Sequence, residues 1–302
     1  MKFTFKYFAI TAGSFFLRLN LFEKGRYRMI SLLLPWLRLL GPEWGKRIIK
    51  TQYGFRFTAD LADWLGQYVY LTGAYEPPTS DIFFKIIKPG DTVIDIGANV
   101  GYFSLLSAKL TGEKGKVYAL EPILSVRENL ISNILLNDYN NIRVIPKAAS
   151  ATAARLTIYE GPEGHKGVSS LRPLSTASRE LTIEAIALDD LIEEMGTVNF
   201  IKIDVEGAEM RALLGMKKII NKDHPSFIIE FTDSYLKSFG DSASQMAEWL
   251  NTHGYQLYRI EEEGLLQLDF SDPTLPGQYN VLATQVSPFA LFNRNNKPSY
   301  QA

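Results

Sequence analysis

The feature that most constrains this chain is a regular alternation of short apolar runs with segments of helical character between residues 92 and 253. The apolar runs have strand length and are Thr92–Ile96, Val117–Leu120, Ile142–Pro146, Asn199–Ile203 and Ser226–Phe231. Helices are predicted over Tyr102–Leu110, Ser125–Asn137, Ala208–Ile219 and Ala243–His253. Uninterrupted apolar strands separated by helices predict a parallel sheet that is covered on both faces.

Two further pairs of runs have no helix pattern between them. Leu156–Tyr159 and Leu181–Ile186 bracket a loop rich in glycine and serine, and they are predicted to pair with each other. Tyr255–Ile260 and Tyr279–Thr284 are the last predicted strands, with a small ribbon that turns at Glu263-Gly264. We therefore predict an α/β fold with a doubly wound, mostly parallel sheet and an antiparallel strand at one edge.

The predicted organisation is one α/β domain between two flanking segments. The ranges are 1–53 for an N-terminal amphipathic helical extension, 54–287 for the domain and 288–302 for a C-terminal tail. At the start of the domain, Gly54–Asp60 is predicted as a strand and Leu61–Leu71 as a helix. A second helix is predicted to begin near Thr79 and to run to Ile87.

Residues 1–40 are apolar, aromatic and basic, with seven lysines and arginines against one glutamate, a net charge of +6. Their longest uncharged run, Tyr7–Leu17, has 11 residues. Spanning a bilayer takes ~20 residues, and Ala12-Gly13-Ser14 is a weak cleavage site, so we expect a cytoplasmic protein. Two interpretations stay open: helices that dock on the domain and cover its pocket, or a peripheral surface for anionic lipid. We favour docking, because amphipathic helices usually bury one face.

Composition narrows the chemistry. The chain has no cysteine, which excludes thiolate zinc sites, iron–sulfur clusters and a cysteine nucleophile. His224 and His253 lack metal-ligand spacing, so no histidine-based zinc site is expected. The net charge of −1 gives no field that would recruit nucleic acid, and we expect no such partner.

The first strand ends in a glycine turn at the place where doubly wound sheets bind ligands. Gly97 and Gly101 are expected to let the backbone turn tightly and approach a ligand, and the following helix directs free amides toward the same space. Asn99 occupies the position where a dinucleotide site needs its middle glycine. Asp95 suits a cationic or hydroxyl-bearing ligand, and a sulfonium nucleoside has both features.

Glu121 follows the second strand, where an acidic side chain can accept hydrogen bonds from both ribose hydroxyls. Dehydrogenases place a carboxylate equivalently, so Glu121 indicates a nucleoside site only together with the Asp95–Gly101 turn. A structural glycine turn beside a solvated carboxylate is the alternative.

A charged segment follows the fourth strand. Alternation along an extended chain would place Lys202, Asp204 and Glu206 on one side, facing the ligand crevice. Such clustering is costly unless the groups pair with one another or with a substrate. The alternative is a Lys202–Asp204 ion pair that only fixes the loop.

These residues resemble the FkbM-like family of S-adenosylmethionine-dependent methyltransferases, over about residues 54–284. The motifs are Val93-Ile94-Asp95-Ile96-Gly97-Ala98-Asn99-Val100-Gly101, Leu120-Glu121-Pro122, Leu188-Asp189-Asp190-Leu191 and Phe200-Ile201-Lys202-Ile203-Asp204-Val205-Glu206-Gly207-Ala208-Glu209, the last being the narrowest. The resemblance implies a Rossmann-like class I methyltransferase domain and methyl transfer to oxygen. The implied cofactor residues are Asp95, Gly97, Asn99, Gly101, Glu121 and Asp204.

The acceptor is expected to be a hydroxyl on a small molecule, sugar or glycolipid. Asp204, Glu206 and His165, which lies in a glycine-rich loop, are candidates for its general base, with Lys202 beside them. The predicted acceptor contacts are Trp64, Tyr68, Tyr75, Ser169 and Ser170. The sequence selects neither one acceptor nor an oligomeric state.

Three alternatives remain. A divalent metal could bind oxygens of Asp189, Asp190, Asp204 and Glu206. Asp189-Asp190 is expected to cap the helix that it opens instead, so no metal is assigned. An NAD(P)-dependent oxidoreductase is disfavoured by Asn99 and by the edge strand Tyr279–Thr284. A non-catalytic module that binds lipid or a partner through residues 1–40 is disfavoured by the complete set of cofactor residues.

Overall fold

The computed structural model describes residues 10–14, 17, 30, 32–37, 39, 45–160, 169–170, 179–272 and 274–288. The chain divides into two compact units, residues 1–77 with 163–165 and 297–302, and residues 78–162 with 166–296. Within the described ranges, no helix is long and apolar enough to cross a membrane.

The N-terminal unit contains a short hairpin followed by a helix. Strands β1 (Lys46–Lys50) and β2 (Arg56–Asp60) pair antiparallel. Helix α3 (Trp64–Thr72) begins where the Asp63 side chain accepts a hydrogen bond from the Leu65 amide, at 3.0 Å. The predicted strand and helix are confirmed. Strand β1 was not predicted, because its sequence Lys-Arg-Ile-Ile-Lys is mostly charged and largely exposed.

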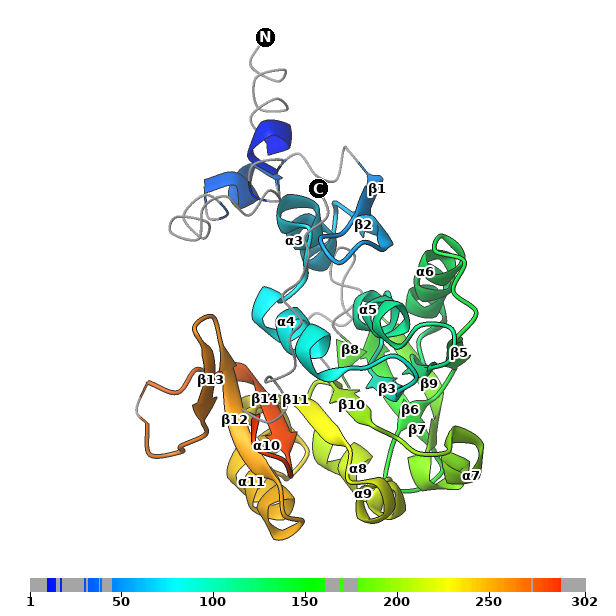
Figure 1. Ribbon diagram of the computed structural model, residues 1–302, viewed down its shortest axis with the longest axis vertical. Coiled ribbons are helices and arrows are strands. Elements are labelled where there is room, and N and C mark those ends of the chain that lie inside the picture. The colour runs from blue at the N-terminus through cyan, green and yellow to red at the C-terminus, as the bar shows by residue number, and fades with distance from the viewer. Residues whose placement is uncertain are drawn as a thin grey trace. The chain divides into compact units, whose positions relative to one another are not determined.

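The larger unit contains an eight-stranded sheet with the order β13-β12-β14-β11-β10-β3-β4-β5 (Figure 1). Its strands are β3 (Thr92–Ile96), β4 (Lys116–Leu120), β5 (Ile142–Ile145), β10 (Phe200–Ile203), β11 (Ser226–Thr232), β12 (Gln256–Glu261), β13 (Gly264–Gln267) and β14 (Gln278–Thr284). The pairs from β11 to β5 are all parallel, which confirms the predicted sheet. The antiparallel edge is also confirmed and consists of β14, β12 and β13, with β14 inserted between β11 and β12.

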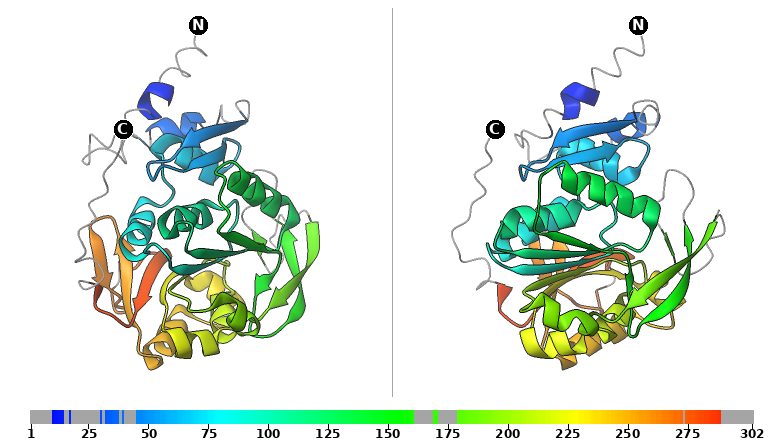
Figure 2. Two further views of the ribbon diagram at one scale, coloured as in Figure 1. Left: turned by 45° about the vertical axis from the view of Figure 1, so that its right-hand side comes forward. Right: turned by 90° about the vertical axis from the view of Figure 1, so that its right-hand side faces the viewer.

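Helices cover both faces of this sheet. They are α4 (Pro77–Ile86), α5 (Tyr102–Thr111), α6 (Leu124–Leu135), α7 (Ile192–Met195), α8 (Glu209–Leu214), α9 (Lys217–Asp223), α10 (Asp233–Ser238) and α11 (Ala243–Thr252). Figure 2 shows α5 and α6 on one face and α8, α9 and α11 on the other. Every residue of β3, β10 and β11 is buried, which is why these strands have mostly apolar sequences.

A second, smaller sheet has the order β6-β9-β7-β8. Its strands are β6 (Ala148–Ala149), β7 (Ala154–Glu160), β8 (Ser169–Ser170) and β9 (Arg179–Ile186). Strands β7 and β9 pair antiparallel from Ala154 opposite Ala185 to Glu160 opposite Arg179, so the predicted strand pair is confirmed.

The predicted helix over Ala208–Ile219 is wrong, because the chain forms two helices there. Gly215 lies between α8 and α9, and a Cβ there would be 2.0 Å from the Ser150 carbonyl oxygen. The backbone between the two helices therefore packs directly against the backbone at Ser150. Asp189, in the 3₁₀ turn Leu188–Leu191, accepts hydrogen bonds from the Lys218 and Ile219 amides at 3.0 and 3.1 Å. Asp189 therefore caps α9, and not the helix that it was predicted to open.

Candidate active site

The strand order reverses between β3 and β10, since β4 and β5 extend the sheet on one side of β3 and β10 and β11 on the other. Asp95 of β3 and Lys202 of β10 are direct cross-strand neighbours at this point. Asp95 is buried, and one oxygen accepts a hydrogen bond from Ser104 Oγ at 2.6 Å. Its other oxygen has no partner among the described residues. The structure therefore places Asp95 at the switch point, where ligands of doubly wound sheets bind.

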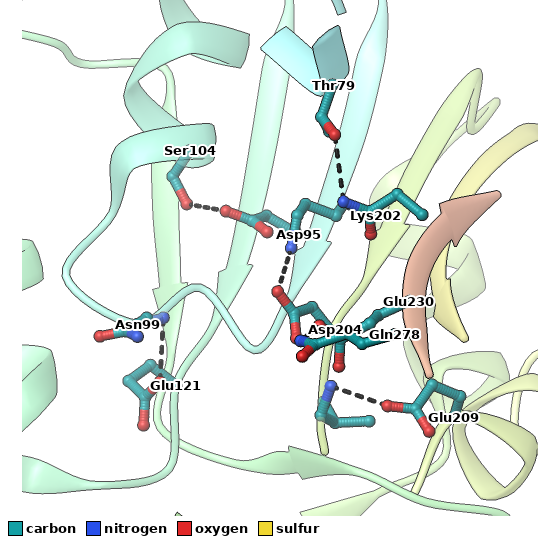
Figure 3. A network of polar contacts seen from close by, with 12 residues as sticks. Thr79, Asp95, Asn99, Ser104, Glu121, Lys202, Asp204, Glu209, Glu230 and Gln278 are labelled. Carbon is teal, nitrogen blue, oxygen red and sulfur yellow. Dashed lines mark hydrogen bonds and ion pairs between the residues drawn. The ribbon is translucent and has the colours of Figure 1, made fainter. Parts of the chain in front are cut away.

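Lys202 is 2% exposed, and its Nζ lies 2.7 Å from Oδ2 of Asp204, whose side chain is 26% exposed (Figure 3). The same Nζ lies 4.7 Å from the centroid of the Phe103 ring. The ion pair considered from the sequence is therefore present. Burial raises the pKa of the Asp95 carboxyl, and the Lys202 ammonium opposes this shift.

The glycine turn after β3 holds three strand ends together. The Gly97 and Ala98 amides both donate to the Leu120 carbonyl, at 3.1 and 2.9 Å, and the Asp204 amide donates to the Ile96 carbonyl at 3.0 Å. Gly97 has φ +80°, and a Cβ there would lie 1.9 Å from the Asp204 carbonyl oxygen. Glycine is required at 97 by this contact within the protein, whereas the sequence suggested approach to a ligand.

We expect Gly97→Ala to lower the free energy of unfolding by about 2 kcal/mol more than Gly90→Ala does. Gly90 has φ +91°, and a Cβ added to it would have no neighbour within 4 Å, so this control carries only the backbone strain. Chemical denaturation of both variants measures the difference. Equal losses would show that the contact with Asp204 does not matter.

Glu121, directly after β4, connects the end of this strand to the glycine turn after β3 through hydrogen bonds. Its two carboxyl oxygens accept hydrogen bonds from the Asn99 amide at 3.0 Å and the Ile123 amide at 2.9 Å. Burial raises the pKa of Glu121 to about 7, against the effect of those two hydrogen bonds. Each carboxylate oxygen can accept a second hydrogen bond, so the predicted ribose contact is compatible with these bonds.

The loop after β10 departs from the expected alternation. Glu206 has φ +53°, so the extended conformation that the alternation assumed ends before it. Glu209 Oε1 accepts hydrogen bonds from the Val205 and Gly207 amides, both at 3.1 Å. This carboxyl therefore holds the loop in its turned conformation.

Glu206 is half-buried, and no described group donates a hydrogen bond to its carboxyl. Burial raises its pKa to about 8, and the charges of Asp204 and Glu209 act in the same direction. A carboxyl without a donor and with a pKa near neutrality has the properties of a general base.

Glu230 is a site residue that the sequence analysis missed. It lies on β11, is 7% exposed, and follows the register pair of Ile203 with Ile229, which places it beside Asp204. Gln278 Nε2 donates to Glu230 Oε1 at 2.5 Å. Burial raises the pKa of Glu230 to about 9, and the Asp204 charge contributes. The detectable signal was the single charge in the buried strand Ser-Phe-Ile-Ile-Glu-Phe-Thr.

We expect the protein to lose stability as pH rises. Unfolded glutamates titrate at 4.5, whereas in the folded chain the pKa is about 7 for Glu121 and Glu209, about 8 for Glu206 and about 9 for Glu230. Between these pKa values the folded state binds more protons than the unfolded state does. The stability that these glutamates contribute is therefore fully present below pH 4.5 and is lost as pH rises through their folded pKa values. Denaturation at pH values across this window should show that the free energy of unfolding falls less steeply with pH in Glu230→Gln than in the exposed control Glu248→Gln. A rise in stability toward alkaline pH would contradict this account.

The remaining predicted site residues belong to other parts of the chain. Trp64, Tyr68 and Tyr75 belong to the N-terminal unit, where the Trp64 and Tyr68 ring centroids lie 5.9 Å apart and those of Tyr68 and Tyr75 6.5 Å apart. Ser169 and Ser170 form β8, which pairs with the end of β7. His165 lies outside the described residues. Among those residues, no group of three or more His, Asp or Glu side chains could hold a metal ion.

Comparison with known families decides the class of protein. A sequence profile described as the methyltransferase FkbM domain matches residues 95–257, which include the turn after β3, Glu121 and the loop after β10. The chain belongs to the FkbM methyltransferase family. FkbM methyltransferases use S-adenosylmethionine, so the methyltransferase interpretation replaces the oxidoreductase one.

Individual relatives are distant and are matched only in part. FkbM of Streptomyces tacrolimicus is 26% identical over 43% of this chain and 61% of its own length. The hexuronic acid methyltransferase AglP of Haloferax volcanii is 26% identical over 54% of this chain and 65% of its own. AmbE of Pseudomonas aeruginosa, an antimetabolite synthetase, is 27% identical over 60% of this chain and 10% of its own length. The chain thus spans less than two thirds of these relatives. The solved FkbM structure from Methylobacillus flagellatus KT is 17% identical, with a TM-score of 0.42, over 84% of this chain and 59% of its own.

The residues at the switch point fit the cofactor of the FkbM family. The buried Asp95 oxygen without a described partner can attract a sulfonium or accept from a hydroxyl. Glu121 supplies acceptor capacity on the neighbouring strand, where ribose hydroxyls would lie. Asn99, with φ +51°, occupies the position that a dinucleotide site gives to its middle glycine.

Proposed function

We propose that this FkbM methyltransferase transfers the methyl group of S-adenosylmethionine to a hydroxyl oxygen of a small-molecule or carbohydrate acceptor. The observation that carries the proposal is the Glu206 carboxyl, which is half-buried, lacks a described donor, and has a pKa of about 8 beside the Lys202–Asp204 pair. A carboxylate of this basicity can take the proton that a hydroxyl releases when its oxygen is methylated.

When bound, S-adenosylmethionine supplies an electrophilic methyl group whose leaving group is a neutral thioether. The chain's own task is to position the acceptor oxygen in line with that methyl group, which can contribute ~7–11 kcal/mol. Asp95, Asn99 and Glu121 would hold the nucleoside, Lys202 would fix Asp204 next to it, and Glu206 would receive the proton. Removal of the proton by a positioned base adds ~10²–10⁴ in rate.

The acceptor contacts named from the sequence remain part of the proposal. Trp64, Tyr68 and Tyr75 form an aromatic group in the N-terminal unit, and such rings can bind the apolar face of an acceptor. His165, Ser169 and Ser170 likewise remain candidates on the grounds given by the sequence. One relative is named for hexuronic acid, which shows a carbohydrate acceptor for that protein.

Label transfer tests the proposed reaction. The chain is incubated with S-adenosylmethionine carrying a labelled methyl group and with a panel of glycosides, glycolipids and hydroxylated metabolites. We expect label in an acceptor to survive mild alkali, because methyl ethers resist hydrolysis whereas methyl esters release methanol. Alkali-labile label would contradict transfer to a hydroxyl, and label on nitrogen would contradict an O-methyltransferase.

A second proposal concerns lipid contact by the N-terminal unit. Leu32, Trp36 and Leu39 are exposed at spacings of four and three residues, so they share one face of a helix. The net charge of +6 over residues 1–40 complements anionic lipid. Co-sedimentation should show binding to phosphatidylserine vesicles, weaker binding to phosphatidylcholine vesicles, and loss of binding in Trp36→Ser. Equal sedimentation of the variant and the parent protein would contradict this contact.

A further inference from the structure

A group of polar and aromatic side chains lies beyond Glu206 at the ends of β11 and β14. Tyr235 lies on α10 and is 39% exposed. Burial raises the pKa of its phenol, and the charges of Glu206 and Glu230 act in the same direction, so the phenol lies close to both carboxyls. A Cβ at Gly207 would lie 2.8 Å from the Tyr235 carbonyl oxygen, which shows that the loop after β10 packs directly on α10.

Thr232 and Gln278 extend this group along the strand ends. Thr232 follows Glu230 by two residues, so both side chains emerge on the same face of β11. Thr232 is 7% exposed, and its hydroxyl has no partner within the described ranges. Gln278 lies opposite Thr232 in the register of β11 with β14, is exposed, and donates to Glu230. A buried hydroxyl without a partner indicates that something outside these residues completes its hydrogen bonds.

We propose that Glu206, Glu230, Thr232, Tyr235 and Gln278 form the subsite that binds the acceptor, and that it takes a neutral polyhydroxylated ring, a sugar, in preference to an anionic one. This inference rests on the proposed methyl transfer to a hydroxyl. These five residues are called the acceptor subsite below.

The functional groups of the acceptor subsite match a ring with several hydroxyls. The carboxyls, the amide and the hydroxyl all both accept and donate hydrogen bonds when the glutamates are protonated. Tyr235 adds an exposed aromatic face of a size that covers an apolar ring surface. An isolated alcohol on an alkyl chain would leave most of these polar groups without a partner, which is unfavourable.

The charges near the acceptor subsite disfavour an anionic acceptor. The charge of Asp204 raises the pKa values of Glu206, Glu209 and Glu230, and the charge of Glu209 also raises those of Glu206 and Glu230. Among the described residues, Lys202 is the cation that lowers the pKa of Glu230, and its ammonium is already bound to Asp204. A carboxylate on the acceptor would leave water to lie near the Asp204 charge, and the described residues here offer it no cation that is not already paired.

Matched sugar probes test the inference on the full chain saturated with S-adenosylhomocysteine. The probes are para-nitrophenyl glucoside and para-nitrophenyl glucuronide, which differ only by a hydroxymethyl group against a carboxylate. Their affinities are measured by saturation-transfer NMR. We expect the glucoside to bind about tenfold more tightly than the glucuronide at neutral pH. Tyr235→Ala and Thr232→Val should each weaken glucoside binding by about fivefold or more.

Two controls separate the ways in which the inference can fail. Tyr258→Ala, on β12, removes a tyrosine outside the acceptor subsite and should leave both affinities unchanged. S-adenosylhomocysteine affinity of each variant reports whether the fold and the cofactor site are intact. Absence of S-adenosylhomocysteine binding by the parent protein would overturn the proposed function itself. Three results would overturn the acceptor subsite alone, provided that S-adenosylhomocysteine still binds. They are no glucoside binding, a preference for the glucuronide, and unchanged glucoside binding by the Tyr235 and Thr232 variants.

Discussion

Lys202→Met is expected to lower the free energy of unfolding by about 3–5 kcal/mol, because it leaves buried carboxylates without their cation. Lys202 is nearly fully buried, pairs with Asp204 and lies beside Asp95 across the strands. Methionine fills a similar volume, so the loss measures the charge and not a cavity. Chemical denaturation at neutral pH gives the value, with the exposed residue Lys217→Met as a matched control.

The pH dependence of the Lys202→Met defect has a definite sign. Without the ammonium, the folded pKa values of Asp95 and Glu230 rise further above their unfolded values, because Lys202 lowers both in the parent protein. A folded pKa above the unfolded one means stability that is lost as pH rises. The defect should therefore shrink in acid and grow in alkali. A defect that is below about 1 kcal/mol and independent of pH would be typical of a surface pair and would contradict this role.

Glu206→Gln is expected to reduce kcat by about 10²–10⁴, because glutamine cannot accept the hydroxyl proton. S-adenosylhomocysteine affinity should stay unchanged, since Glu206 holds neither the turn after β3 nor the Lys202–Asp204 pair. The measurement uses the acceptor that label transfer identifies, and Glu248→Gln on α11 is the control for loss of one surface carboxyl.

The pH profile of kcat distinguishes Glu206 from His165. With Glu206 as base, the rate rises with pH through a pKa of about 8. A histidine base gives a rise through ~6.5 instead. If kcat of the parent protein rises through ~6.5 and Glu206→Gln keeps full activity, Glu206 is not the base.

The parallel part of the fold followed from the sequence because burial on both faces leaves a strong pattern. Strands β3, β10 and β11 are mostly apolar, so their positions were evident. Strand β1 was missed because exposed residues on both sides hide the alternation. The position of β14 between β11 and β12 depends on long-range pairing, which no local pattern reports.

The candidate site followed from the sequence only where a residue ends a recognisable strand. Asp95, Glu121 and Asp204 were singled out for that reason, and the structure has all three at the ends of strands. The turned conformation at Glu206 was missed because it depends on two amide hydrogen bonds to Glu209. Glu230 was passed over as an isolated charge, since its relation to Asp204 arises from strand register and not from sequence distance. Asp189 was assigned to its own helix because its bonds to α9 cross about thirty residues of chain.

Isothermal titration with S-adenosylhomocysteine tests most directly whether the switch point between β3 and β10 is the cofactor site. We predict micromolar binding by the parent protein and a loss of about tenfold or more in both Asp95→Ala and Glu121→Ala, because each removes a charged hydrogen-bonding group. Circular dichroism of each variant checks that it is folded. Binding of NADH in place of S-adenosylhomocysteine, or undiminished binding by both folded variants, would contradict the account.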